Sequence, residues 1–270
     1  MTQRGKSSVT ARWYGIARPD LGWVPPLRYL SRRRELFGIA RSWPRGARVA
    51  EIGCGAGAFL HDLSGMGFDV TGVETSEEAR ALAVALREAQ SGSWPIHDDI
   101  VRLEGAFDVI AAFDVLEHIE DDAAFLESLR RFAKPGALLC VSVPAHRRWW
   151  GPGDVWAGHF RRYDREDLIQ LIERAGWSVE RIVPYGFPIA SATELLGRPY
   201  YARIVARRGE TTAQDATALS GIDRRPYISF WPILGSRVGG LIVRATLALQ
   251  AVAWPERWSA GYIAVARAAR

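Results

Sequence analysis

Short apolar runs alternate with longer segments of helical periodicity along most of the chain. Apolar runs bounded by turn residues are typical of buried strands, whereas apolar positions three and four residues apart are typical of helices. Strands that alternate with helices in this way predict a parallel sheet wound by right-handed crossovers. The predicted strands are 48–52, 68–73, 94–97, 107–113, 137–143, 177–183 and 262–266, with predicted helices at 59–66, 77–89, 125–132 and 165–175.

Two segments fall outside this alternation, and the first is the N-terminus. Residues 1–11 are predicted to be disordered. A helix is predicted from Arg28 to Arg41, and it ends before the breaker pair Trp43-Pro44. The aromatic residues of this segment either pack against the rest of the protein or form a flap over a ligand. We therefore predict an N-terminal helical segment, or flap, at 1–45.

The second segment, 185–258, lies between the last two predicted strands. Its first part, 188–206, is predicted to be helical in pieces, and a polar loop follows at 208–226. We interpret the whole segment as a helical cap inserted between strands six and seven. The core domain is then composed of residues 46–184 and 259–270.

The end of this insertion, 230–254, is long and mostly apolar. Arg237 and Arg244 interrupt it, so no uninterrupted stretch of about 18 apolar residues exists and no membrane span is predicted. A cap helix packed on the domain is the simpler interpretation. The alternative is an amphipathic surface that contacts membrane lipid or a hydrophobic substrate.

The net charge of +5 raises the question of a nucleic-acid partner. Lys6 and Lys134 are the only lysines, and a preference for arginine this uniform indicates GC-rich coding rather than a phosphate-binding patch. Acidic residues also accompany the basic ones, as in 161–167. We expect no nucleic-acid partner.

The rest of the composition is that of an ordinary globular protein, with 48% hydrophobic and 24% charged residues. Residues 1–12 are polar and basic, without the apolar core of a signal peptide. Cys54 and Cys140 fall at predicted strands, where reduced, packed thiols are expected. We expect a cytoplasmic protein, with attachment to the inner membrane face through 230–254 as the alternative.

A glycine-rich turn follows the first predicted strand. Gly53, Gly55 and Gly57 stand between that strand and a helix, an arrangement that cradles nucleotides in doubly wound α/β domains. Glycine lets a ligand approach the backbone amides closely and permits positive φ. The run Gly53-x-Gly55-x-x-Ala58 also fits a loose dinucleotide fingerprint. Glu74, at the end of the second strand, would accept from the ribose hydroxyls of either NAD or S-adenosylmethionine (SAM).

An ordered series of motifs separates these two cofactors. The motifs are Glu51-x-Gly53-x-Gly55-x-Gly57, Glu74, Asp98-Asp99, Phe107-Asp108-Val109-Ile110 and Asp114-Val115-Leu116-Glu117-His118. With this series the chain resembles the class I SAM-dependent methyltransferases, in particular the ubiquinone-biosynthesis-like group, over about residues 45–183. This resemblance implies a doubly wound, Rossmann-like and mostly parallel sheet of seven strands, whose last strand is antiparallel beside the sixth.

The resemblance also implies a set of SAM contacts. The glycines approach the methionine part of SAM, and Glu51 supports the loop or the amino group. Glu74 takes the ribose diol. Either Asp98 or Asp99 binds the adenine amine. The other contacts implied are Cys54, Thr75, Ile100 beside the adenine ring, and Phe113 with Asp114 at the methionine end.

Histidines offer the candidate catalytic base. SAM carries its own activation, so the enzyme mainly positions a nucleophile, and an oxygen nucleophile usually needs its proton removed. His159, in the loop 145–163, is the preferred base, and its alternative role is to tie down the loop together with Arg161. His118 is the second candidate, and its alternative role is to bind the loop at a helix start. No metal site is predicted.

The loop 145–163 is also rich in tryptophan and arginine. Arg161 and Arg162 are predicted to grip a carboxylate or phosphate on the acceptor, although a solvated basic run before Asp164 is the alternative. Tryptophans suit a flat aromatic or lipid-like acceptor, or simply pack the loop. The predicted substrate contacts are Tyr14, His146, Trp149, Trp150, Arg161, Arg162 and Tyr163, and Trp156 joins the aromatic group.

The sequence thus predicts a SAM-dependent methyltransferase that acts on a small-molecule acceptor, by in-line displacement at an oxygen nucleophile. Three alternatives remain open. The first is a membrane-peripheral methyltransferase of a lipid-linked or quinone-like acceptor. The second is an NAD-dependent oxidoreductase, and the third is a SAM-binding protein without catalytic activity.

Overall fold

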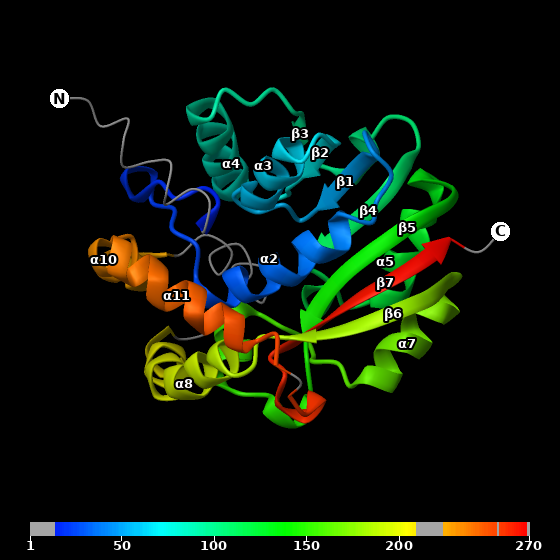
Figure 1. The fold of residues 1–270 in the computed structure, drawn as a ribbon. Coiled ribbons are helices and arrows are strands. Elements are labelled where there is room, and N and C mark those ends of the chain that lie inside the picture. The colour runs from blue at the N-terminus through cyan, green and yellow to red at the C-terminus, as the bar shows by residue number, and fades with distance from the viewer. Residues whose placement is uncertain (1–13, 209–223, 253, 269–270) are drawn as a thin grey trace.

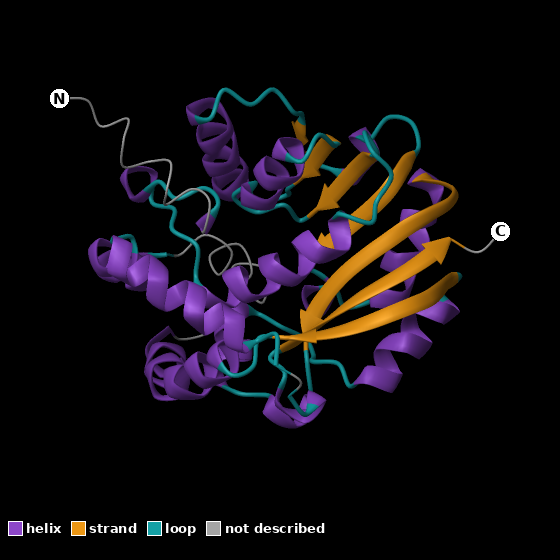
Figure 2. Cartoon of the chain, in the orientation of Figure 1, coloured by secondary structure: helices purple, strands orange, loops and turns teal. Residues whose placement is uncertain are grey.

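A mixed β-sheet forms the centre of the protein. The computed structural model describes residues 14–208, 224–252 and 254–268. Its strands are β1 (Arg48–Ile52), β2 (Asp69–Val73), β3 (Ile96–His97), β4 (Phe107–Phe113), β5 (Ala133–Pro144), β6 (Trp177–Tyr185) and β7 (Gly261–Ala268). They form a seven-stranded sheet in the order β3-β2-β1-β4-β5-β7-β6 (Figures 1 and 2). β7 runs antiparallel between β5 and β6, and the other pairs are parallel. The predicted Rossmann-like fold is confirmed.

Helices cover both faces of this sheet. The longer ones are α2 (Leu27–Ala40), α3 (Ala58–Gly65), α4 (Glu77–Ala89), α5 (Asp122–Leu129), α6 (Pro152–Ala157), α7 (Arg165–Arg174), α8 (Ile189–Arg208), α10 (Arg225–Leu234) and α11 (Arg237–Leu249). Leu36 of α2 and Phe59 of α3 belong to the core on one face. Leu126 of α5 and Leu168 of α7 belong to the core on the other face. The chain therefore forms three layers around the sheet.

The central strand β4 shows why the sheet needs both layers. Val109 and Ala111 face the first core, and Ile110 and Ala112 face the second. All four are fully buried, and a strand covered on both faces has the continuous apolar sequence seen here. The predicted strand, 107–113, matches β4 residue for residue.

Strand β5 is longer than the sequence predicted. The strand was predicted at 137–143, but β5 starts at Ala133, so Lys134-Pro135-Gly136 lie inside it. The register with β4 shifts between Phe107 and Val109. Pro135 lacks an N–H for the ladder and is accommodated where regular pairing is interrupted. Lys134 also binds Asp108 on β4, with Nζ 2.8 Å from both carboxylate oxygens.

The helices between β6 and β7 differ from the prediction in detail. Residues 189–208 form one helix with Pro199 inside it, rather than several pieces. The apolar segment 230–254 is divided between α10 and α11. Ser236 caps α11 by accepting a hydrogen bond from the Gly239 N–H at 3.0 Å. This N-cap marks the start of α11 as a helix separate from α10.

Some predicted features lie outside the described residues. These are the disordered segment 1–11 and most of the polar loop 208–226. Within the described ranges, no single helix has the length and apolar composition of a membrane span. The α10–α11 pair passes the same test jointly, but the two helices meet at a bend of 101°.

Candidate active site

A cavity of about 930 Å³ lies at the carboxyl ends of β1, β2 and β4. Ligand sites of doubly wound sheets occupy this position because the turns after the parallel strands meet there. Its walls come from these turns, from residues 23–32 of the N-terminal segment, and from α6, α8 and α10. Cavities for small molecules measure about 300–1,000 Å³. This one therefore has room for a cofactor together with an acceptor.

The glycine turn after β1 forms part of the cavity wall. Gly53 has a φ of 68° and donates its N–H to the carbonyl of Val73 at 2.8 Å. A Cβ on Gly53 would stand 2.5 Å from a methyl carbon of Val115, closer than packed carbon atoms come. Gly55 has a φ of 54° and lines the cavity. The turn therefore requires glycine for both its conformation and its packing.

Glu74 is held rigidly at the same edge of the sheet. Gly55 donates its N–H to Oε2 at 2.8 Å, and Ser76 donates its N–H to Oε1 at 2.9 Å. Each oxygen keeps acceptor capacity for one more donor, because an ionised carboxylate accepts about four hydrogen bonds. Glu74 and Thr75 both line the cavity. The geometry suits a pair of neighbouring ligand hydroxyls.

Two ionisable groups with incomplete hydrogen bonding, Glu51 and Arg32, line the cavity. Glu51 is buried, and burial raises its pKa to about 8 while Arg32 opposes the shift. Among the described residues, neither Oε2 of Glu51 nor Nε of Arg32 has a hydrogen-bond partner. Buried polar atoms are nearly always bonded. A free carboxylate oxygen and a free guanidinium N–H fit the ammonium and carboxylate of an amino-acid ligand such as the methionine end of SAM.

Asp114 completes this charged floor. It follows β4 with a φ of 54° and pairs with Arg32 and more loosely with Arg28, whose Nη2 is 3.8 Å away. Burial alone would raise the pKa of Asp114, but the two guanidinium groups hold it below its usual value. Ser142 also donates its hydroxyl to the carboxylate at 3.1 Å.

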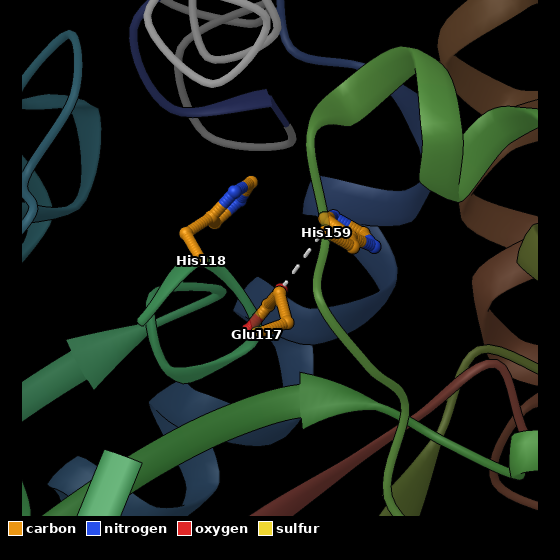
Figure 3. A group of neighbouring side chains, drawn as sticks. All are labelled: Glu117, His118 and His159. Atoms are coloured by element: carbon orange, nitrogen blue, oxygen red, sulfur yellow. Dashed lines mark ion pairs between the residues drawn. The ribbon is translucent and has the colours of Figure 1, made fainter. Parts of the chain in front are cut away.

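Three ionisable side chains come together beside the cavity, which His118 and His159 line, whereas Glu117 is fully buried. Glu117 and His118 belong to the short turn after β4, and His159 approaches them from the loop after α6 (Figure 3). The His159 Nε2 is 4.0 Å from Oε1 of Glu117, and the two imidazole centroids are 4.7 Å apart. Burial raises the pKa of Glu117, and the nearby charge of Asp114 raises it further. Burial also lowers the pKa of His118 to about 4, helped by His159.

Asp154 fixes the orientation of His159. Its Oδ1 lies 2.9 Å from Nδ1 of His159 and accepts a hydrogen bond from Nε of Arg162 at 2.7 Å. Its Oδ2 accepts from the Gly151 N–H at 2.8 Å. These bonds to His159 and Arg162 outweigh burial and lower the pKa of Asp154 to about 2. Asp154 is therefore ionised at neutral pH and selects the His159 tautomer that has its proton on Nδ1.

The same group has the composition of a cation site. Glu117, His118 and His159 each offer one ligand atom, and these atoms lie within 4.8 Å of one another. Imidazole nitrogens and carboxylates bind divalent transition metals. Neither oxygen of Glu117 has a hydrogen-bond partner among the described side chains. The group can therefore receive either an acceptor hydroxyl or a divalent cation.

Aromatic side chains form another part of the cavity wall. Trp156 of α6 lies against Tyr201 of α8, with ring centroids 4.9 Å apart. Tyr227 of α10 and Trp23 of the N-terminal segment also line the cavity. The helices of the insertion thus provide a largely aromatic surface.

The cavity brings together about half of the predicted site residues. These residues belong to the turns after the strands and to the loop after β5. They are Glu51, Gly53, Cys54, Gly55, Glu74, Thr75, Phe113, Asp114, His118, His159 and Arg162.

The other predicted residues lie outside the cavity lining and have structural partners. Asp98 pairs with Arg102, with 2.7 Å between the carboxylate and Nε, and Asp99 accepts a hydrogen bond from the Val101 N–H. Their neighbour Ile100 and the helix-start glycine Gly57 are also outside the lining. The proposed adenine contact therefore stays a prediction.

The predicted substrate residues outside the lining tie down the loops. His146 bonds the Glu256 carbonyl at 3.0 Å, and Trp149 packs edge-on against Trp258. Arg161 and Tyr163 both bind the carboxylate of Asp122. The remaining two are Tyr14, whose hydroxyl donates to the Leu234 carbonyl, and Trp150, which is exposed.

Several residues of the site were not singled out from the sequence. The lining residue Arg32 was only one of a run of arginines. Asp154 also lines the cavity, but no sequence pattern indicated its contact with His159. Glu117, which is buried beside the lining, was visible in the motif but received no role. Tyr200, Tyr201 and Tyr227 belong to the insertion, where no strand ends or glycine turns mark a site.

Comparison with known proteins agrees with this geometry. A family model described as a methyltransferase domain matches residues 26–182, which is more than half of the chain. A ubiquinone biosynthesis O-methyltransferase from Xanthomonas axonopodis pv. citri (strain 306) is 28% identical over 51% of this chain and 58% of its own length. One from Sodalis glossinidius (strain morsitans) is 29% identical over 63% of this chain and 72% of its own length. The chain thus spans a little over half of the first of these relatives.

A solved structure shares the fold. The magnesium protoporphyrin IX methyltransferase from Synechocystis PCC 6803, with bound S-adenosylhomocysteine, superposes with a TM-score of 0.50. It is 19% identical and covers 68% of this chain and 90% of its own.

Proposed function

The chain belongs to the class I SAM-dependent methyltransferase family, and we propose that it transfers a methyl group from SAM to an oxygen atom of a small aromatic acceptor. The observation that carries the proposal is the Asp154–His159 pair. It presents an oriented imidazole to the cavity that the glycine turn and Glu74 also line. The NAD-dependent alternative is not retained, because the matching family is one of methyltransferases.

The glycine-turn side of the cavity fits SAM. Glu74 would accept hydrogen bonds from the two ribose hydroxyls, since its carboxylate is already fixed by the amides of Gly55 and Ser76. Glu51 and Arg32 would bind the ammonium and the carboxylate of the methionine end, which satisfies the two atoms that lack partners. SAM, when bound, supplies an electrophilic methyl group on a positively charged sulfur.

His159 would accept the proton of the acceptor. Asp154 takes the hydrogen bond from Nδ1–H, so the lone pair of the imidazole is on Nε2. Nε2 points toward the group formed with Glu117 and His118 (Figure 3). An acceptor hydroxyl bound there would transfer its proton to Nε2 as its oxygen bonds the methyl carbon. Base catalysis of this kind contributes about 10²- to 10⁴-fold to a rate.

The acceptor is proposed to be flat and largely apolar. Trp156, Tyr201 and Tyr227 line the cavity, and aromatic side chains stack on planar rings. The curated relatives are named O-methyltransferases, which supports oxygen as the methylated atom.

The test uses purified protein, SAM with an isotopically labelled methyl group, and matched model acceptors. Catechols and phenols that carry an alkyl chain are compared with anilines of the same shape. We expect labelled methyl ethers and one equivalent of S-adenosylhomocysteine from the hydroxyl compounds. Methylation of the anilines alone would overturn the assignment to oxygen. Binding of SAM without turnover of any acceptor in the panel would favour the non-catalytic alternative.

A further inference from the structure

The outer faces of α10 and α11 are apolar, and no other part of the described chain covers them. Ile233 on α10 is 67% exposed, and Leu241 on α11 is 63% exposed. Large apolar side chains scattered singly on a surface need no explanation, but a contiguous group on neighbouring helices marks an interaction site. The exposed members of this apolar face are Phe230, Ile233, Val238, Leu241, Ile242 and Leu249.

The apolar face is distinct from the side on which α11 packs. Val243 of α11 is buried in a small core with Tyr14 and Leu30, and Leu247 packs against the same core. Val238, Leu241, Ile242 and Leu249 are exposed instead, at the spacing of one helix face. The inner face already anchors α11 to α2, so the outer face does not serve the stability of the described fold.

The charged residues of α11 have one sign. Arg237 and Arg244 are exposed on this helix, and α10 and α11 contain no aspartate or glutamate. Apolar side chains combined with arginines match a membrane surface that contains anionic lipids. We propose that α10 and α11 dock the protein on the surface of an anionic lipid bilayer.

The dimensions favour docking in the plane of the membrane. A helix rises about 1.5 Å per residue, so these two helices of 10 and 13 residues are each shorter than the roughly 30 Å of a hydrocarbon core. The bend of 101° between the two helices keeps them from adding their lengths along one axis. Such a pair lies at the interface with its apolar side chains in the acyl region.

The docking face is connected to the cavity through shared helices. Tyr227 of α10 lines the cavity, whereas Phe230 and Ile233 of the same helix are exposed. Figure 1 shows α8, α10 and α11 together at the side of the sheet to which the arrowheads of β1 and β4 point. Docking would place the cavity near a bilayer from which an apolar acceptor could enter. This consequence depends on the proposed function, whereas docking itself does not.

A second copy of the chain fits the apolar face less well. Contact between two such faces would bring Arg237 and Arg244 of both copies together, and α10 and α11 contain no acidic residue to pair with them. Like charges facing each other across an interface disfavour it. The charge pattern therefore favours an anionic lipid surface.

The test is sedimentation of the full chain with vesicles of phosphatidylcholine and phosphatidylglycerol, and with vesicles of phosphatidylcholine alone. We expect binding to the anionic vesicles that weakens with added salt. The double variant Ile233→Glu/Leu241→Glu should reduce the binding roughly tenfold or more, because it removes apolar area and adds negative charge. Both side chains are exposed, so the fold should be retained, which a thermal melt checks.

The matched control is Val101→Glu. Val101 is also 67% exposed, but it lies in the turn after β3 and not on α10 or α11. It should bind vesicles as the unaltered protein does. Equal binding by the double variant, or no binding by the unaltered protein, would overturn the proposal. The proposal would also be overturned if the unaltered protein did not bind vesicles but formed a dimer, and if the double variant were monomeric. Vesicle binding needs no acceptor, so its failure is distinguishable from a failure of methyl transfer.

Discussion

Asp154 and His159 are joined by a hydrogen bond of 2.9 Å between Oδ1 and Nδ1. A second bond fixes the backbone in the same place, since the His159 N–H donates to the Asp154 carbonyl at 3.0 Å. Arg162 binds the same carboxylate oxygen and holds its charge. The imidazole is therefore oriented by the short helix α6 before any acceptor enters.

Replacing the proposed base should separate chemistry from cofactor binding. We expect His159→Gln to lower kcat by about 100-fold or more, because the side chain no longer accepts a proton. The affinity for SAM should stay unchanged in calorimetry. His61→Gln is the matched control, since His61 lies on α3 outside the cavity lining. Unchanged kcat in His159→Gln would exclude this residue as the base.

Asp154 should make stability depend on pH in the acid range. Its folded pKa is about 2 against an ordinary value of 3.8. The folded state thus favours the ionised carboxylate more than the unfolded state does. This contribution to the free energy of unfolding is present above pH 4 and is lost as pH falls toward 2. The difference corresponds to about 2 kcal/mol in the free energy of unfolding. Urea unfolding between pH 5 and pH 2 measures it, and Asp154→Asn should have a flatter profile than the unaltered protein.

Glu51 should give the opposite dependence on pH. Its folded pKa is about 8 against 4.5, so its contribution to stability is full below pH 4.5 and is lost as pH rises through 8. A bound ammonium would pair with the ionised carboxylate. We therefore expect SAM to raise the Tm more at pH 8 than at pH 6. Glu51→Gln should abolish this difference, and a pH-independent shift in the unaltered protein would contradict the ammonium contact.

Glu74 should be needed for SAM binding itself. We expect Glu74→Gln to weaken binding of SAM by about 100-fold, because the amide offers only one acceptor oxygen to the Gly55 and Ser76 amides and to the ribose. Calorimetry measures the affinity. Glu77→Gln serves as control, since Glu77 is an exposed acidic residue three positions along on α4. Equal affinities of the two variants would exclude the ribose contact.

Removal of divalent metal distinguishes two uses of the Glu117–His118–His159 group. If His159 acts as a base, methyl transfer should persist after dialysis against EDTA. Loss of activity that zinc or magnesium restores would indicate instead that these three residues hold a cation. Elemental analysis of the purified protein provides a readout that is independent of activity.

The regular elements of the core could be predicted because their signals are local. Strands 48–52 and 107–113 and helix 77–89 have the bounds that the apolar period indicated. Gly55 and Glu74 were predicted to contact the same cofactor. Parallel strands end at a common edge, and the structure joins the two residues there by a hydrogen bond of 2.8 Å.

The orientation of the loop after β5 could not be predicted in this way. Its histidines, arginines and tryptophans have no period, so the sequence does not indicate which side chains face the ligand. Contacts with distant residues decided it: Arg161 and Tyr163 turn to Asp122, and His146 turns to Glu256. Only His159, Arg162 and Trp156 of the predicted residues there line the cavity.

The sequence by itself determined the central strands and helices, because short-range apolar periodicity defines them, and it placed the glycine turn and Glu74 at the ends of two neighbouring strands. The cofactor family came from the resemblance of the ordered motifs to the class I SAM-dependent methyltransferases. Tertiary structure alone decided the partners of the buried charges. Arg32 reaches Asp114 from 82 residues away, and Arg162 reaches Glu194 across 32. Such pairs depend on how the helices of the N-terminal segment and the insertion pack over the sheet, and packing of this kind depends on the whole chain rather than on any local pattern.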